Sequence, residues 1–309
     1  MTPVLIDTDP GIDDALALLF AWSSPEIRVE FITTVAGNVP VVAANTNLAR
    51  LLALRRPAPR PVAAPGAAGP LARALNTATR YHGEDGLGDL PDWPAAEPLK
   101  ESPGAVSVMV DAARRYGREL TLIALGPLTN VALALKENAA AMGRIGRVVA
   151  MGGAVDVPGN VTPTAEFNMN VDPEAAHRVF AAGLPLDIVP LDATRQAVLP
   201  RVGMRATLAR SPGPLAGRIQ AFSERGFRIS HADGEAGMAL HDPLAVAVAI
   251  DPSLVKWEAV RLAIGPDGET QRASGAPNCR IAKGVDRDRF IGFFLDRLCP
   301  ATPERRASS

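Results

Sequence analysis

Four aspartates are crowded near the start of the chain, and carboxylates at this density are suited to holding a metal ion. Asp7, Asp9, Asp13 and Asp14 all fall within the segment DTDPGIDD. Four like charges this close together strongly raise each other's pKa unless a positive charge lies among them. The simplest such charge is a divalent cation held by oxygen ligands. The segment therefore predicts a metal site.

The residues around this segment indicate how the carboxylates are positioned. Val4-Leu5-Ile6 is typical of a buried strand, Pro10-Gly11 of a turn, and residues 12–22 of a helix that follows at once. The aspartates thus stand at a strand-to-helix junction. In an open α/β sheet, ligands bind outside the carboxyl ends of the strands, so position and chemistry agree.

A structural role is the alternative for these aspartates. The helix dipole by itself favours acids such as Asp13 and Asp14 in a first helical turn, and Asp7 could cap its own turn. These preferences leave Asp9 unexplained. We therefore favour the metal site.

Strand and helix patterns alternate along the rest of the chain. Further strands are predicted at 27–35, 61–64, 120–125, 147–151, 186–191, 257–264, 270–274 and 279–285, and further helices at 40–55, 104–116, 128–136, 242–250 and 287–298, with irregular helix over 200–230. This rhythm is typical of a mostly parallel sheet with helices on both faces. We predict one α/β domain over residues 1–309, an open mostly parallel sheet flanked by helices, with a disordered tail at 300–309.

Composition excludes several other classes of protein. The chain has 309 residues, 47% of them hydrophobic, and its longest apolar run is far short of the about 20 residues of a membrane span. Cys279 and Cys299 show no metal-type spacing, so a disulfide framework and a zinc site are not expected, and the cytoplasm is the expected compartment. With 32 basic and 33 acidic residues, neither nucleic acid nor a membrane surface is an expected partner. A small neutral or weakly charged ligand fits better.

The segment DTDPGIDD resembles the N-terminal pattern D-x-D-P-G-x-D-D of the inosine-uridine-preferring nucleoside hydrolase family. Five more matches follow in the family's order, at about its spacing: TTVAGN at 33–38, HGEDGL at 82–87, LGPLTN at 125–130, MGG at 151–153 with EFN at 166–168, and HDPLA at 241–245. The resemblance covers roughly residues 3 to 295. It implies the nucleoside hydrolase fold with a Rossmann-like core, a ribonucleoside substrate, and a homodimer or homotetramer.

The resemblance also assigns residues to the site. It places Asn160, Glu166 and Asn168 on the ribose hydroxyls, helped by Asp13 and Asn38, with Met151 as an apolar wall and His82 near the base. It implies one Ca²⁺ held by Asp9, Asp14, Asp242 and the backbone carbonyl of Leu125. Oxygen ligands without Cys or clustered His favour calcium or magnesium over zinc, and six to eight ligands suit calcium.

The implied reaction is hydrolysis of the N-glycosidic bond, giving free base and ribose. Calcium would lower the pKa of its bound water, and Asp9 would take the proton of that water as general base. Carboxylates around the ribose would stabilise a transition state resembling an oxocarbenium ion. The resemblance assigns His241 to the leaving base, because a near-neutral pKa suits proton donation, and His82 could assist.

Several of these residues also have a purely structural interpretation. Asp242 could merely cap a helix, the segment 160–170 could be a polar surface loop, and His82 and His241 could be structural. Base preference is left open, because the tyrosines found in some family members before the HDP motif are absent here, where Phe222, Arg225, Phe227 and His231 stand.

Two other functions are compatible with parts of the sequence. Asp7-Thr8-Asp9 also resembles the nucleophile motif of haloacid-dehalogenase-type Mg²⁺ phosphatases, although Pro10-Gly11 departs from that pattern. A non-catalytic nucleoside or ribose sensor on the same fold is the second alternative. Such a sensor would bind a nucleoside without releasing base.

Overall fold

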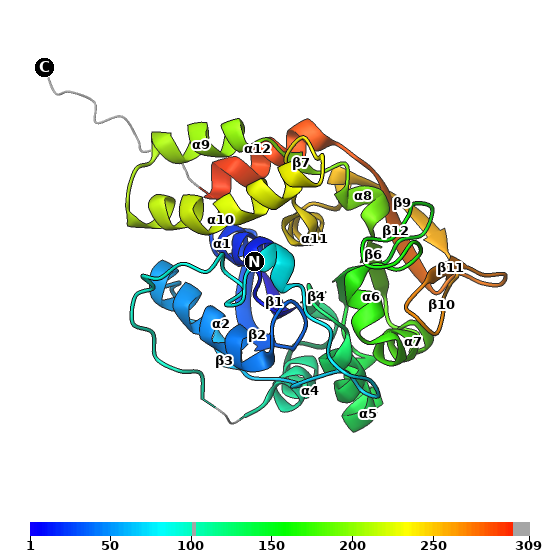
Figure 1. The fold of residues 1–309 in the computed structure, drawn as a ribbon. Helices are drawn as coiled ribbons and strands as arrows, with labels where there is room; N and C mark the ends of the chain where they lie inside the picture. Colours follow the sequence, from blue (N-terminus) through cyan, green and yellow to red (C-terminus); the bar gives the residue numbers. More distant parts are fainter. Residues whose placement is uncertain (101–102, 299–309) are drawn as a thin grey trace, which may run out of the picture.

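The computed structural model describes residues 1–100 and 103–298 (Figure 1). The tail predicted at 300–309 lies outside the described residues, and the organisation as one domain stays a prediction. Among the residues described, no helix has the length and the apolar character needed to cross a membrane.

An eight-stranded sheet forms the centre of the structure, with the order β3-β2-β1-β4-β5-β6-β12-β9. Neighbouring strands are parallel except β12 and β9, which are antiparallel. The strands of this sheet are β1 (Thr2–Thr8), β2 (Ile27–Thr34), β3 (Val62–Ala64), β4 (Thr121–Ala124), β5 (Arg147–Met151), β6 (Leu186–Val189), β9 (Val255–Val260) and β12 (Cys279–Val285). Two small antiparallel pairs are β7 (Val198–Leu199) with β8 (Met238–Ala239), and β10 (Leu262–Ile264) with β11 (Thr270–Arg272). The prediction of an α/β fold with a mostly parallel sheet is confirmed.

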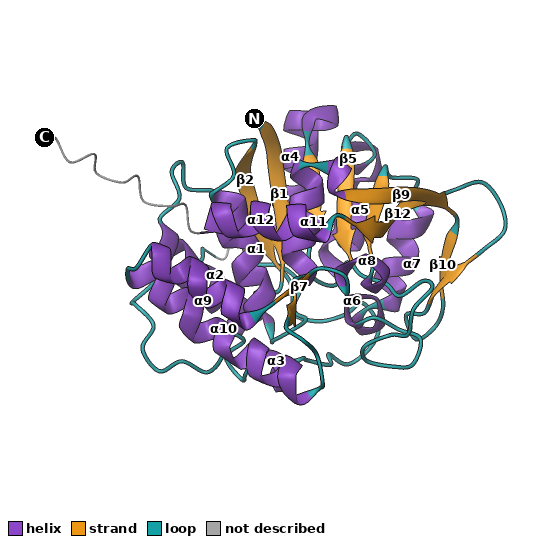
Figure 2. Cartoon of the chain, turned by 90° about the horizontal axis from the view of Figure 1, so that it is seen from above, coloured by secondary structure: helices purple, strands orange, loops and turns teal. Residues whose placement is uncertain are grey.

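Helices cover both faces of the sheet (Figure 2). They are α1 (Ile12–Trp22), α2 (Val41–Arg55), α3 (Thr79–His82), α4 (Ala105–Tyr116), α5 (Thr129–Met142), α6 (Phe167–Val171), α7 (Pro173–Ala181), α8 (Leu191–Thr194), α9 (Arg201–Arg210), α10 (Pro214–Ala232), α11 (His241–Ile250) and α12 (Arg287–Leu298), with 3-10 turns at Gly117–Glu119 and Pro252–Leu254. Successive side chains of a strand point to opposite faces. In β1, Val4 and Ile6 therefore join the core under α1, α2, α11 and α12, whereas Leu5 joins the core under α4, α5 and α7.

The strand order places a ligand crevice beside β1. From β3 to β6 the order is 3-2-1-4-5-6, so the direction of the crossovers reverses between β1 and β4. In such sheets the carboxyl ends of the two strands at this reversal splay apart and leave a ligand crevice. The residues that follow the two strands are Asp9, after β1 ends at Thr8, and Leu125, after β4 ends at Ala124.

The structure differs from the predicted elements at several points. Helix α5 continues past Lys136 to Met142, across a non-helical residue at Asn138. The strand predicted at 257–264 is split into β9 and β10. Helix α7 was not predicted, although its start carries a local signal: Asp172 accepts a hydrogen bond from the Ala175 N–H at 3.0 Å, and a proline takes the first helical position.

Candidate active site

Three carboxylates meet at the reversal of strand order. Asp13 and Asp14 lie in the first turn of α1, and Asp242 lies in the first turn of α11, the helix packed against α1. One carboxylate oxygen from each lies within 4.8 Å of the others. All three side chains are buried. Two helix starts, positive ends of their dipoles, thus face one acidic cluster.

Asp9 lies beside this cluster, and its carboxylate fits there because two neighbouring residues are glycines. A Cβ atom on Gly37 would stand 2.0 Å from its Oδ2, and one on Gly126 would stand 2.5 Å from its Oδ1. The backbone N–H of Asn38 donates to Oδ2 at 2.6 Å. Oδ1 is buried, and no residue in the described part of the chain forms a hydrogen bond with it. Burying a carboxylate oxygen without a partner is unfavourable in free energy unless a ligand or an ion binds to it.

Asp14 is held by neutral donors from both flanking loops. Its Oδ1 accepts from the Thr8 hydroxyl at 2.5 Å, and its Oδ2 accepts from the Gly11 N–H at 3.0 Å and from Asn38 Nδ2 at 2.9 Å. Asn38 thereby joins Asp9 and Asp14 through its backbone and its side chain. The orientation of both carboxylates is fixed by the end of β1 and the loop after β2.

Burial and mutual repulsion act on the same carboxyls. Burial, followed by the charge of Asp14, raises the pKa of Asp13 to about 7 and holds the pKa of Asp9 well above its usual range. Burial and the charges of its three neighbours likewise raise the pKa of Asp242. A cation among these groups would remove the repulsion and favour the charged forms. The orphaned Asp9 oxygen and the all-oxygen donor set fit a hard divalent cation.

The Leu125 carbonyl is the backbone oxygen predicted for the metal site. It accepts a hydrogen bond from Asn168 Nδ2 at 2.6 Å. A carbonyl oxygen has two lone pairs, so this bond leaves one for a further interaction. Asn168 Nδ2 also lies 3.2 Å from the Met151 carbonyl, so it bridges the ends of β4 and β5.

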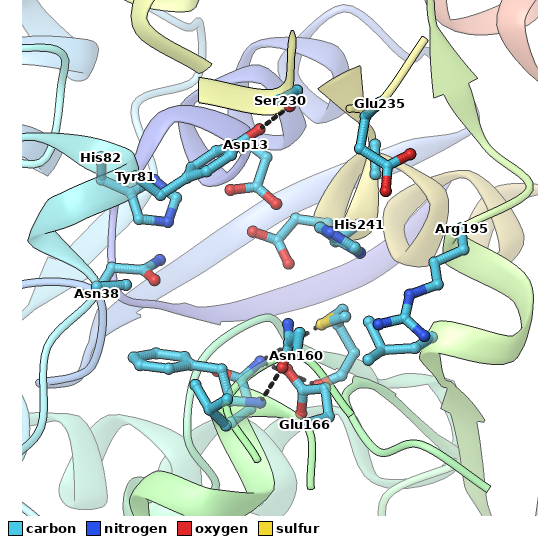
Figure 3. Close-up of a pocket in the computed structure, with 18 of the residues that line it drawn as sticks. Asp13, Asn38, Tyr81, His82, Asn160, Glu166, Arg195, Ser230, Glu235 and His241 are labelled. Carbon is cyan, nitrogen blue, oxygen red and sulfur yellow. Dashed lines mark hydrogen bonds between the residues drawn. The ribbon is translucent and has the colours of Figure 1, made fainter. Parts of the chain in front are cut away.

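A cavity of about 330 Å³ opens above the carboxylates (Figure 3). This volume is at the lower end of the range for small-molecule sites. The predicted site residues that line it are Asp13, Asn38, His82, Leu125, Met151, Asn160, Glu166, Asn168, His241 and Asp242. Asp9 and Asp14 lie behind this surface, 1% and 0% exposed. The structure thus brings the predicted residues to one place.

Glu166 and Asn160 line the side of the cavity formed by the loop after β5. Glu166 is buried, and its Oε2 accepts from the Gly153 N–H at 2.9 Å and the Met169 N–H at 3.3 Å. Burial raises its pKa. Asn160 is exposed, and its Oδ1 accepts from the Phe167 N–H at 2.9 Å. Carboxylate and amide groups of this kind bind sugar hydroxyls, which both donate and accept.

His82 is fixed against the start of α1. Its Nδ1 accepts from the Ile12 N–H at 3.0 Å, which satisfies one of the free backbone donors at a helix start. Burial lowers its pKa to about 4, so it is neutral at neutral pH. Since Nδ1 accepts, the proton of the neutral ring is on Nε2. His82 is therefore a buried histidine with one fixed tautomer, and not an exposed loop residue.

His241 differs from the expectation drawn from the sequence. A near-neutral pKa was predicted, and this is wrong, because burial lowers it to about 4, with the charge of Arg195 as the next cause. Its Nδ1 lies 2.7 Å from the hydroxyl of Thr194, a buried residue at the end of α8. When the hydroxyl donates this bond, the ring proton is on Nε2. The neutral ring is then a hydrogen-bond donor.

Sequence reasoning missed several residues of the cavity wall. Tyr81, Arg195 and Ser230 line it, and Thr194 supports His241 from behind. Tyr81 directly precedes the HGEDGL match, which was the only available signal. Arg195 and Ser230 stand in no motif and reach the cavity only through the tertiary fold.

Comparison with known proteins identifies the family. A family profile described as "Inosine-uridine preferring nucleoside hydrolase" matches residues 4–292. The chain belongs to this family. It is accordingly a nucleoside hydrolase, and the phosphatase alternative falls away.

Individual relatives agree with this assignment. The chain is 37% identical, over 97% of both chains, to a pyrimidine-specific ribonucleoside hydrolase RihA of Shewanella sp. (strain MR-4). Its structure is similar to that of a purine-preferring ribonucleoside hydrolase from Gardnerella vaginalis, with a TM-score of 0.90, 30% identity and coverage of 96% and 98%. A plant nucleoside hydrolase, PpNRh1, gives a TM-score of 0.90, 32% identity and coverage of 97% and 99%.

The carboxylate cluster predicts a measurable effect of a divalent cation on stability. After removal of metal with a chelator, a cation added at 100 times its Kd is expected to raise the free energy of unfolding by about 2.7 kcal/mol. Asp242→Asn should fold and lose this response, because one charged ligand is gone. Thermal unfolding with and without the cation measures the response of the wild type and of Asp242→Asn. Asp111→Asn, at an exposed carboxyl of α4, is the matched control. An equal response in Asp242→Asn and the control would contradict the site.

Proposed function

We propose that the protein catalyses the Ca²⁺-dependent hydrolysis of the N-glycosidic bond of ribonucleosides, giving free base and ribose. The observation that carries this proposal is the orphaned oxygen of Asp9 beside the cluster of Asp13, Asp14 and Asp242, at the inner end of a cavity lined by carboxylates and amides. The relatives named as ribonucleoside hydrolases support the substrate class.

Calcium would be held by Asp9, Asp14, Asp242 and the carbonyl of Leu125, with the nearby Asp13 adding negative charge. When bound, the cation would neutralise these carboxylates and lower the pKa of water in its coordination sphere. Calcium takes six to eight oxygen ligands and tolerates irregular geometry, which suits a set built from one loop, two helix starts and a strand end. Ribose hydroxyls can provide the ligands that the protein does not.

Asp9 is the proposed general base. The bound cation would keep the Asp9 carboxylate charged, and a charged carboxylate beside a water can accept a proton from it. Water oxygen would bond to C1′ while the bond from C1′ to the base nitrogen breaks and its electron pair leaves with the base. The proton lost by the water would go to Asp9.

The ribose is proposed to lie against the inner end of the cavity. Asn160, Glu166 and Asn168 would bind its hydroxyls from one side, and Asp13 and Asn38 from the other. Met151 would provide an apolar wall. Buried carboxylates here would stabilise positive charge that develops on the sugar in the transition state.

His241 and His82 are proposed to stabilise the leaving base. Both rings are neutral at neutral pH, so each would act by donating a hydrogen bond from Nε2. The start of α1 sets this tautomer in His82, and in His241 the same tautomer results when the Thr194 hydroxyl donates to Nδ1. These hydrogen bonds would stabilise the negative charge that the departing base takes with the electron pair, and the base would then take its proton from solvent water.

Three further expectations stay predictions. Base preference is open, since the relatives include pyrimidine-specific and purine-preferring enzymes. A homodimer or homotetramer is expected from the family resemblance. The cytoplasm is expected from composition.

Base release tests the proposed reaction. Inosine, adenosine, guanosine, uridine and cytidine are incubated with the enzyme, with and without a chelator that removes calcium. We expect chelator-sensitive release of base from at least one, and a loss of about 10²–10⁴-fold in Asp9→Ala. The fold of the variant is checked by circular dichroism. A folded Asp9→Ala enzyme with full activity would overturn the assignment of the base, and binding without release by the wild type would indicate the sensor.

The role of His241 is tested by changing the leaving group. His241→Ala is expected to slow hydrolysis of natural nucleosides far more than hydrolysis of p-nitrophenyl riboside, because that leaving group departs without protonation. Steady-state kcat/KM for both substrates measures the difference. Equal losses on both would show that His241 has only a structural role.

A further inference from the structure

The outer end of the cavity is built where α3 meets the C-terminal part of α10. Tyr81 and Arg80 come from α3, whereas Ser230 and Asp233 come from the end of α10, and all four line the cavity. The hydroxyls of Tyr81 and Ser230 lie 3.1 Å apart. Arg80 forms two hydrogen bonds with Asp233, at 3.0 and 2.5 Å. Segments about 150 residues apart in the chain thus form one wall.

Arg225 fixes the two helices to each other. Its Nη2 donates to the carbonyls of Thr79 and Arg80, both at 3.2 Å, and its Nη1 donates to Asp89 at 2.9 Å. Its side chain is 21% exposed, so these bonds are partly shielded from water. The position of Tyr81 on the cavity wall is therefore set by the contact between the helices.

Tyr81 lies next to His82 and apart from the proposed sugar-binding groups. The two rings are 5.0 Å apart at an angle of 67°. Figure 3 shows the Tyr81 hydroxyl directed toward Ser230, at the opposite end of the view from Asn160 and Glu166. If the ribose lies on the inner carboxylates, its C1′ substituent passes between His82 and His241 toward this outer end.

The hydroxyl pair has hydrogen-bonding capacity to spare. Each hydroxyl has one hydrogen and two lone pairs, and the bond between them uses one hydrogen and one lone pair. One O–H hydrogen and several lone pairs are left to a ligand. A phenol keeps its hydrogen at neutral pH, and burial raises the pKa of Tyr81 further. Since hydroxyls rotate, the pair can donate to a carbonyl or ring nitrogen and can equally accept from an amino group.

We propose that the Tyr81–Ser230 hydroxyl pair binds the edge of the nucleobase and accepts keto and amino bases alike. This inference rests on the proposed function and adds the residues that contact the base. Tyr81 is a tyrosine supplied by α3, whereas sequence comparison directs attention to α10, where no tyrosine stands.

The test compares Tyr81→Phe with the wild type on uridine and cytidine, and on inosine and adenosine. Loss of one hydrogen bond of about 1.4 kcal/mol is expected to lower kcat/KM about tenfold, by a similar factor within each keto and amino pair. Methyl riboside, which has no base, is expected to inhibit the variant and the wild type with inhibition constants within about twofold. Tyr116→Phe, at the second tyrosine of the chain, on α4 against Phe31, is the matched control and should match the wild type.

Further variants separate binding from packing. Ser230→Ala should lower kcat/KM for nucleosides as Tyr81→Phe does, and the double variant should lose less than the sum of the two, because the hydroxyls act as a pair. Weaker inhibition by methyl riboside would show that Tyr81 only supports the pocket and would overturn the proposal. So would unchanged kinetics, or a loss confined to keto or to amino bases. If the wild type binds nucleosides without releasing base, the proposed function fails, and the same comparison is made on Kd by calorimetry.

Discussion

Repulsion between buried carboxylates is the constraint on which the rest of the site depends. Asp9, Asp13, Asp14 and Asp242 are all buried, and like charges in a poorly solvated place are unfavourable without a counter-charge. The protein provides part of the compensation itself, through hydrogen bonds from Thr8 and from the loop after β2, and through two helix starts. The oxygen of Asp9 that receives none of these bonds is where a cation is most needed.

The backbone must approach closely for this cluster to form, and glycines make the approach possible. Gly37 and Gly126 leave room for the carboxylate of Asp9 on its two sides. Gly11 has the same role for His82, which is proposed to contact the nucleobase, since a Cβ atom on Gly11 would stand 2.6 Å from His82 Nδ1. Three of the matched motifs therefore contain a glycine that lies in space against a polar side chain of the site, where a larger residue would clash. The loops after β1, β2 and β4 can converge only because these side chains are missing.

The residues at the inner end of the site could be predicted from the sequence, whereas Tyr81 and Ser230 at the outer end could not. Asp9 and Asn38 could be placed because each follows a strand with a clear apolar pattern, and strand ends of a parallel sheet converge. Tyr81 and Ser230 could not, because their meeting depends on how α10 packs against α3, which no local pattern encodes. The pKa of His241 was missed for a similar reason: histidine chemistry gives a near-neutral value, and only the tertiary fold shows that the ring is partly buried, with the charge of Arg195 acting on it. Helix α7 was missed although Asp172 and Pro173 carry its start signal.

The location of the cation tests this account most directly. Crystals of the protein grown with Ca²⁺ and measured for anomalous scattering should show one strong peak, about 2.3–2.6 Å from oxygens of Asp9, Asp14, Asp242 and the Leu125 carbonyl. Such a peak would join the orphaned oxygen, the buried charges and the end of β4 in one coordination sphere. A peak elsewhere, or none in crystals of an active enzyme, would contradict the central claim that these carboxylates are assembled around a metal ion.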